Sequence, residues 1–286
     1  MKKILVPTDF STNSKSGVRF AIHWATRQKL ELLFVHVLHI LRPTQWTDTY
    51  FAKYSAQKEK LCRIKFEKFI ADIYRQMNVK PGKYSSIIVN GISADITLLD
   101  YCRKRVDIDY ICISTRGAGK FNKILGTNTG NLITKSQIPV LAIPKNYRVA
   151  DVKSVLYATD LRNYADEIAK VVAFAQPLKT TIDVVHFTWP DEILFDEKMI
   201  EAAFKKEFKY GLKIYFKKND GIHSLIKNLE TQIRIRKPSV VIMFTNQERT
   251  FFQKLFLSSK AEELSFQLKV PLLVFSKNSK PFSNLQ

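Results

Sequence analysis

Hydrophobic residues fall in short runs, separated by longer segments in which apolar residues recur every three or four positions. The runs are rich in Val, Ile and Leu; examples are Ile4-Leu5-Val6, Leu33-Phe34-Val35 and Ile111-Cys112-Ile113. Continuous apolar runs of this length are typical of parallel strands that are buried on both faces of a sheet. The pattern therefore predicts buried strands that alternate with other elements.

The segments between the runs have the periodicity of amphipathic helices. Segment 11–28 begins with residues favoured at helix N-caps and places apolar residues on one face, namely Val18, Ala21, Ile22 and Ala25. Further helices are predicted over 52–77, 93–104 and about 127–135. Strands that alternate with helices predict right-handed crossovers and an open, doubly wound α/β sheet.

The second part of the chain repeats the first. Five pairs of similar segments occur in the same order: 3–9 with 154–160, 33–37 with 183–187, 90–92 with 220–222, 109–113 with 239–243, and 138–143 with 269–274. A short polar stretch at 144–148 separates the two copies. We expect one domain over residues 1–147 and a second, shorter in its middle, over 148–286.

The chain is strongly basic, with 46 Lys and Arg against 26 Asp and Glu and a net charge of +20. Such a charge is compatible with a nucleic-acid or anionic-membrane partner. The lysines are spread over most segments, however, which favours solvated basic faces over a nucleic-acid interface. The positive field would still concentrate phosphate-bearing ligands near the protein.

The sequence does not indicate export or membrane insertion. No stretch approaches the roughly 18 apolar residues that span a bilayer, and the first apolar run ends at Asp9, too early for a signal peptide. The three cysteines, Cys62, Cys102 and Cys112, lack CxxC spacing and are odd in number. We therefore expect a cytoplasmic protein with neither a disulfide framework nor a metal site.

The segment after the fourth predicted strand is rich in glycine. Residues 114–129 read STRGAGKFNKILGTNT, and the next helix is predicted to begin near Thr127. A glycine-containing loop followed by a helix N-terminus can bind phosphate through backbone N–H groups, and Arg116 and Lys120 would add positive charge. The segment is neither a Walker A motif nor a GxGxxG fingerprint. The residues alone leave two alternatives open, a phosphate cradle and a tight loop that binds nothing.

Taken together, these segments resemble the universal stress protein family in a tandem, two-domain form. The resemblance rests on residues 4–11 (ILVPTDFS), 35–37, Gly91 and 114–144, and it covers nearly the whole chain. The ATP-binding members of the family carry Gly-x2-Gly-x9-Gly-Ser/Thr after the fourth strand. Here Ser114 takes the place of the first glycine, and eight residues instead of nine separate Gly117 from Gly126.

The resemblance implies an adenine-nucleotide site in the first domain. Pro7, Thr8 and Asp9 would line the base and ribose, with Asp9 accepting from a ribose hydroxyl, and Val37 would contact the adenine through its backbone. The phosphates would lie between the fourth strand and the following helix, near Ile113, Ser114, Arg116, Gly117, Gly126, Thr127, Asn128 and Thr129. ATP is the expected ligand, with Mg²⁺ as its counter-ion only.

The second domain departs further from the family pattern. Its corresponding segment, 244–259, has no glycine and adds Glu248 and Phe251-Phe252, so we expect this domain to be structural. The resemblance also implies two doubly wound folds of the flavodoxin-like or adenine-nucleotide-α-hydrolase-like kind, each with a five-stranded parallel sheet in the flavodoxin-like order. The fifth strands, 139–144 and 270–275, would pair inside the chain as a pseudo-two-fold dimer.

Two hypotheses for function follow, and a third comes from another class. The first is a stress-response regulator that binds adenine nucleotide; the second is a family member without nucleotide that acts as a protein-interaction scaffold. The third is a nucleotide hydrolase. No residue stands out as a general base beside the phosphates, so we do not expect an efficient enzyme, and slow ATP hydrolysis is left open. Association of two chains into a homodimer is also left open.

Overall fold

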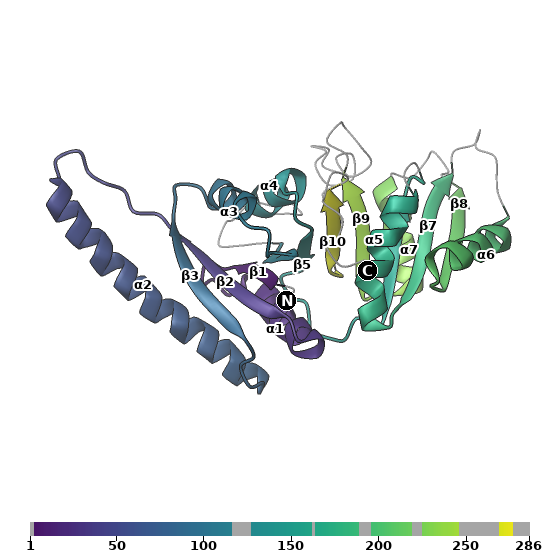
Figure 1. Cartoon of the computed structure of the whole chain (residues 1–286), viewed down its shortest axis with the longest axis horizontal. Helices are drawn as coiled ribbons and strands as arrows, with labels where there is room; N and C mark the ends of the chain where they lie inside the picture. The colour runs from purple at the N-terminus through teal and green to yellow at the C-terminus, as the bar shows by residue number, and fades with distance from the viewer. Residues whose placement is uncertain are drawn as a thin grey trace.

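A single hydrogen-bonded sheet of ten strands runs through the molecule, in the order β3-β2-β1-β4-β5-β10-β9-β6-β7-β8 (Figure 1). The structure is a computed structural model that describes residues 3–115, 127–161, 164–188, 196–218, 225–245 and 269–276. Within each half all neighbouring strands are parallel. The predicted doubly wound α/β class is therefore confirmed.

The elements of the two halves follow one another as predicted. The first half contains β1 (Lys3–Pro7), α1 (Lys15–Gln28), β2 (Glu31–Leu38), α2 (Asp48–Met77), β3 (Tyr84–Asn90), α3 (Ala94–Arg103), β4 (Tyr110–Ser114), α4 (Thr127–Lys135) and β5 (Val140–Ile143). The second contains β6 (Ser154–Thr159), α5 (Tyr164–Leu178), β7 (Thr181–Thr188), α6 (Glu197–Phe208), β8 (Leu212–Lys218), α7 (Leu225–Arg236), β9 (Val240–Thr245) and β10 (Leu272–Ser276). The division at 147/148 stays a prediction.

The order of strands within each half differs from the expected flavodoxin-like order. That order is 2-1-3-4-5, whereas the first half has β3-β2-β1-β4-β5 and the second has the matching β8-β7-β6-β9-β10. Strand β3 thus lies beyond β2, and the chain then passes over β2 and β1 to reach the position of β4. The point where the order reverses consequently lies between β1 and β4, and between β6 and β9.

The two halves join through their fifth strands, as the resemblance implied. Strands β5 and β10 run antiparallel, with Leu141 opposite Leu273 and Val140 opposite Val274. A second contact joins equivalent positions on the first helices, because the rings of Trp24 in α1 and Phe174 in α5 meet edge to face at 5.6 Å. Pairing covers two apolar edge strands that would otherwise be exposed.

The strands bury both of their faces. Ile4 and Val6 of β1 face a core layer formed with α1, α2, α5 and α6, while Leu5 faces a second layer formed with α3, α4 and α7. Helix α2 is an exception in its first half: its buried residues, Phe66, Ile70, Ile73 and Tyr74, all lie in the second half. Figure 1 shows this helix on the outer side of β3.

Candidate functional site

The carboxyl ends of β1 and β4 lie side by side at the reversal point of the first half. Ile4 and Leu5 pair with Tyr110 and Ile111, so the residues that follow both strands reach the same edge of the sheet. Helix α1 begins soon after β1, and α4 begins on the same edge after β4. In open α/β sheets this is where ligands bind, and the positive dipole ends of two helices favour an anion there.

A chain of hydrogen bonds fixes the start of both helices to the strand ends. The Thr8 and Ser14 hydroxyls are 2.9 Å apart, and the Ser114 hydroxyl donates to the Ser14 carbonyl at 3.1 Å. The Thr129 hydroxyl in turn donates to the Ser114 carbonyl at 3.0 Å. All four side chains are buried. The chain therefore holds the first turn of α4 beside the end of β4 in a single arrangement.

Ser114 is bonded to α1 and does not present its hydroxyl at the open edge. Its oxygen accepts from the Gly17 N–H at 2.8 Å, while its proton goes to the Ser14 carbonyl. A Cβ atom on Gly17 would lie 2.8 Å from the Ser114 nitrogen and 3.0 Å from its hydroxyl oxygen. Gly17 thus lets α1 approach the strand closely enough for this contact.

The turn after β1 is also held by the stacked rings of Phe10 and His36. Phe10 has a φ of 62°, in the left-handed region, and its N–H donates to the Thr8 hydroxyl at 3.1 Å. Its ring stacks on His36 of β2 at 4.1 Å between centroids. Nδ1 of His36 donates to the Thr8 carbonyl at 2.8 Å. Burial lowers the pKa of His36, so the neutral imidazole is favoured and Nδ1 carries its proton.

The remaining predicted residues of the base and ribose region lie at the same edge. Pro7 ends β1 and is half-buried, as is Val37, near the end of β2. Asp9 is exposed, and one of its carboxylate oxygens accepts from the Ser11 N–H at 3.0 Å. A carboxylate has capacity for further donors, so this bond is compatible with a second one from a ligand hydroxyl.

The predicted phosphate residues are only partly described. Ile113 is half-buried in β4, Thr127 is the first residue of α4, and Asn128 beside it is exposed. Arg116, Gly117 and Gly126 lie outside the described residues. The structure therefore brings Thr8, Ser114 and Thr129 together directly, while the loop that would complete the cradle is not described.

A buried carboxylate joins α4 to its neighbour α3. Asp95 accepts from the Asn131 amide at 2.5 Å and from the Ser93 hydroxyl, and its side chain is 5% exposed. Burial alone would raise the pKa of Asp95, but the hydrogen bonds from Ser93 and Asn131 hold it below its usual value. This link joins α4 to the first turn of α3.

Three residues of this edge were not predicted to belong to it. Ser14 directly precedes α1, Ser16 lies in the first turn of that helix, and His36 lies in β2. A signal was present in the sequence, because His36 and His186 repeat at matching positions after matching Thr-Asp segments. Their shared task, a hydrogen bond to the carbonyl of Thr8 or Thr159, explains the repetition.

Neither a metal cluster nor a membrane-spanning helix is found in the part of the chain that the structure describes. No group of three or more His, Cys, Asp or Glu residues is placed to hold a metal ion there. No helix in those ranges is both long and apolar enough to cross a bilayer.

Comparison with known proteins agrees with the architecture. The family model described as the universal stress protein family matches residues 1–144. The chain belongs to the universal stress protein family. Comparison with curated protein sequences gave no match.

Two solved structures resemble this universal stress protein over nearly its whole length. A universal stress protein from Archaeoglobus fulgidus DSM 4304 is 18% identical, with a TM-score of 0.68 and 96% of each chain covered. A protein of unknown function from Pseudomonas aeruginosa PAO1 is 16% identical, with a TM-score of 0.60, and the match covers 96% of this chain and 92% of that one. At these identities the likeness shows the fold.

Proposed function

We propose that this universal stress protein binds one adenine nucleotide, foremost ATP, at the edge formed by β1, β4 and α4, and acts in stress-response regulation. The observation that carries the proposal is the hydrogen-bonded chain Thr8–Ser14–Ser114–Thr129, which fixes two helix N-termini beside two strand ends. A rigid edge of this kind offers backbone N–H groups and positive dipole ends to phosphates at no cost in reorganisation.

The side chains at this edge suit a nucleoside better than a bare phosphate. Asp9 is exposed and acceptor-only when ionised, so it would favour a ribose hydroxyl and disfavour an anion at its own position. Half-buried Pro7 and Val37 provide apolar surface on the same side. The phosphates would then lie toward α4, away from the Asp9 carboxylate.

The test begins with the protein as purified. Its ratio of absorbance at 260 and 280 nm and mass spectrometry of the denatured supernatant would show a carried adenine nucleotide. Titration of nucleotide-free protein with ATP should then give saturable binding. Absence of binding at millimolar ATP would contradict the proposal. Turnover of ATP measured in the same samples should be slow or nil, because Asp9, the exposed carboxylate of this edge, is assigned to the ribose and not to the phosphates.

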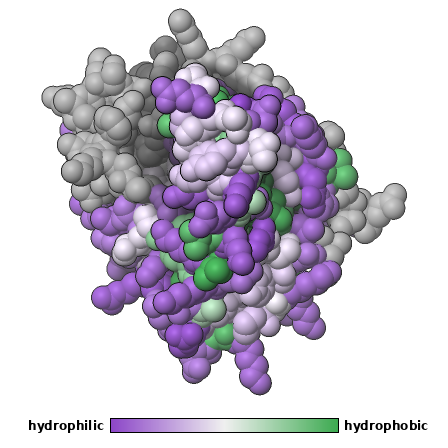
Figure 2. Space-filling view, turned by 90° about the vertical axis from the view of Figure 1, so that its left-hand side faces the viewer, coloured by the Kyte–Doolittle hydropathy of each residue, from purple (hydrophilic) through white to green (hydrophobic). Residues whose placement is uncertain are grey.

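A second candidate function, a protein-interaction scaffold, is favoured by one surface. The outward face of α2 carries Tyr50, Leu61 and Ile64, each more than half exposed, on a helix whose first half buries no residue. Apolar side chains are visible among hydrophilic ones on this side of the molecule (Figure 2). Exposed apolar patches of this kind mark interaction surfaces. This role takes first place if ATP does not bind.

A further inference from the structure

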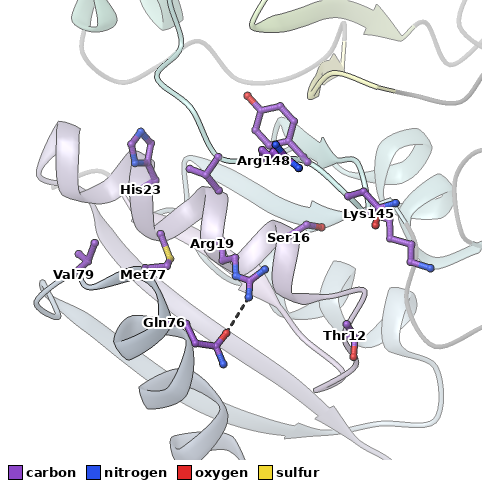
Figure 3. A pocket seen from close by; sticks show the side chains of 12 residues that line it. Thr12, Ser16, Arg19, His23, Gln76, Met77, Val79, Lys145 and Arg148 are labelled. Atoms are coloured by element: carbon purple, nitrogen blue, oxygen red, sulfur yellow. Dashed lines mark hydrogen bonds between the residues drawn. The ribbon is translucent and has the colours of Figure 1, made fainter.

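A second concave surface lies beside α1, apart from the candidate nucleotide edge. Its volume is about 650 Å³, which is within the range of about 300–1,000 Å³ usual for small-molecule sites. One wall is α1 and the end of α2, and the other is the segment 145–149 that leaves β5 (Figure 3). Every lining residue belongs to the described part of the chain.

Three cationic residues line this cavity, and they come from both of its walls. Arg19 comes from α1, while Lys145 and Arg148 come from the opposite segment (Figure 3). No aspartate or glutamate lines the cavity, and within the described ranges no carboxylate pairs with any of these three side chains. Like charges gathered on a concave surface repel one another, so binding of an anion is favoured.

Asp151, the acidic residue nearest to Arg148 along the chain, is already paired. Asp151 accepts from His23 Nε2 at 2.8 Å and lies 3.4 Å from Arg27 Nε. His23 lines the cavity but Asp151 does not. Among the residues that the structure describes, no carboxylate is then left to compensate the charge of Arg19, Lys145 and Arg148.

Neutral donors complete the lining. Thr12 lies in the turn before α1 and Arg19 lies within the helix. The Arg19 guanidinium is oriented by a 2.9 Å bond to the Gln76 amide oxygen. The exposed Thr12 hydroxyl and the remaining guanidinium N–H groups are donors of the kind that bind phosphate oxygens. An arginine fixed in orientation loses little conformational freedom on binding.

From this geometry we infer that the cavity binds a small anion with two or more phosphate groups. Three cations line the cavity, so an anion with two or more phosphate groups carries enough negative charge to neutralise Arg19 on one wall together with Lys145 and Arg148 on the other. The cavity is distinct from the nucleotide edge, although Ser16, which lines it, also bonds to Ser114 at 3.0 Å. The inference goes beyond the proposed function and does not depend on it.

The probe is inorganic tripolyphosphate, titrated calorimetrically into the nucleotide-free full chain without Mg²⁺. Wild type should bind it, and the double variant Arg19→Gln/Arg148→Gln should bind at least about tenfold more weakly, since charge-assisted bonds are lost. The matched control Arg63→Gln/Arg75→Gln removes the same charge from the exposed surface of α2 and should bind like wild type. Unchanged unfolding midpoints would show that both variants fold.

Three results would overturn the inference. They are no binding by wild type, full binding by the Arg19/Arg148 variant, or an equal loss in the control, which would show only a general charge effect. An ATP titration of the same variants separates the sources of oligophosphate. Unchanged ATP binding would show a site separate from the nucleotide, and a parallel loss would show that the phosphates of the nucleotide are what the cavity holds.

Discussion

The two halves have the same turn after their first strand and differ in the residues where their first helix meets their fourth strand. The Thr8 hydroxyl accepts from the Phe10 N–H at 3.1 Å, and the Thr159 hydroxyl accepts from the Leu161 N–H at 2.9 Å. Both donating residues have a positive φ. His36 and His186 repeat the same bond to the threonine carbonyl. The turn that presents Asp9 or Asp160 is therefore maintained in both halves.

The divergence begins where α1 meets β4. The sheet register places Phe244 of β9 where β4 has Ser114. The first helices of the two halves can be aligned at Lys29 and Lys179, the residues with positive φ that end them. This alignment places Glu167 of α5 where α1 has Gly17. Phe244 stacks on Phe275 at 5.0 Å, and Glu167 accepts a buried hydrogen bond from Tyr157. The small contact between Gly17 and Ser114 is thus replaced by two large side chains where α5 meets β9.

The comparison shows that two features are independent of each other: the turn after the first strand of each half, and the close approach of α1 to β4. The turn depends on local bonds within a few residues and survives in both copies. The proposed phosphate site adjoins a close approach between α1 and β4, which Gly17 and Ser114 supply together. Neither residue is kept in the second half, where Glu167 and Phe244 take their places.

The largest effect is expected from filling the close approach. Gly17→Ala would place Cβ 2.8 Å from the Ser114 nitrogen and should lower the free energy of unfolding by about 2–4 kcal/mol. Gly130→Ala in α4 is the matched control: its Cβ would meet nothing within 4 Å, so it should be neutral or stabilise by up to about 1 kcal/mol. Urea unfolding of both variants measures the difference, and equal effects would refute the close-approach account.

A smaller effect is expected when the family glycine is restored at position 114. Ser114→Gly removes the hydroxyl that accepts from Gly17 and donates to Ser14, which should reduce stability by about 1–2 kcal/mol. If that hydroxyl serves α1 and not the ligand, the Kd for ATP should change by less than about twofold. Urea unfolding and ATP titration test the two statements separately. A large loss of ATP affinity with unchanged stability would mean that the hydroxyl contacts the nucleotide.

The smallest effect concerns protonation of His36. Because burial lowers its pKa in the folded chain, the unfolded chain binds this proton at higher pH than the folded chain does. Its contribution to stability is therefore full above about pH 6.5 and is lost as the pH falls through the folded pKa. His36→Asn, which keeps a donor near Thr8, should flatten the stability–pH curve from pH 7.5 to 5. A curve of wild-type shape in His36→Asn would contradict the assignment.

Much of the fold could be predicted because the local pattern of apolar and polar residues determines which segments form helices and strands. Helix 127–135 was predicted at its observed bounds, and the pairing of the fifth strands agrees with β5 and β10. Helix α2 begins four residues before the predicted start, because Thr47 caps it and accepts from the Tyr50 N–H at 3.3 Å.

The strand order and the role of Ser114 could not be obtained in this way. Periodicity determines which segments are strands, but the lateral position of β3 depends on how two crossovers pack, and flavodoxin-like and observed orders share the same element sequence. Ser114 was expected to approach phosphates, whereas its hydroxyl bonds to residues about a hundred positions earlier in the chain. No spacing rule links Gly17 to Ser114, because their contact exists only after the sheet has formed.

The central claim is that the chain holds one nucleotide, in its first half. Calorimetric titration of ATP into wild type, Asp9→Ala and Asp160→Ala tests it most directly, because the two aspartates occupy the same place on the shared turn. We expect a stoichiometry of one in wild type, a loss of about 10- to 150-fold in affinity for Asp9→Ala, since a charge-assisted bond contributes about 1.5–3 kcal/mol, and no change for Asp160→Ala. Two equivalent sites in wild type, or equal losses in the two variants, would contradict the account.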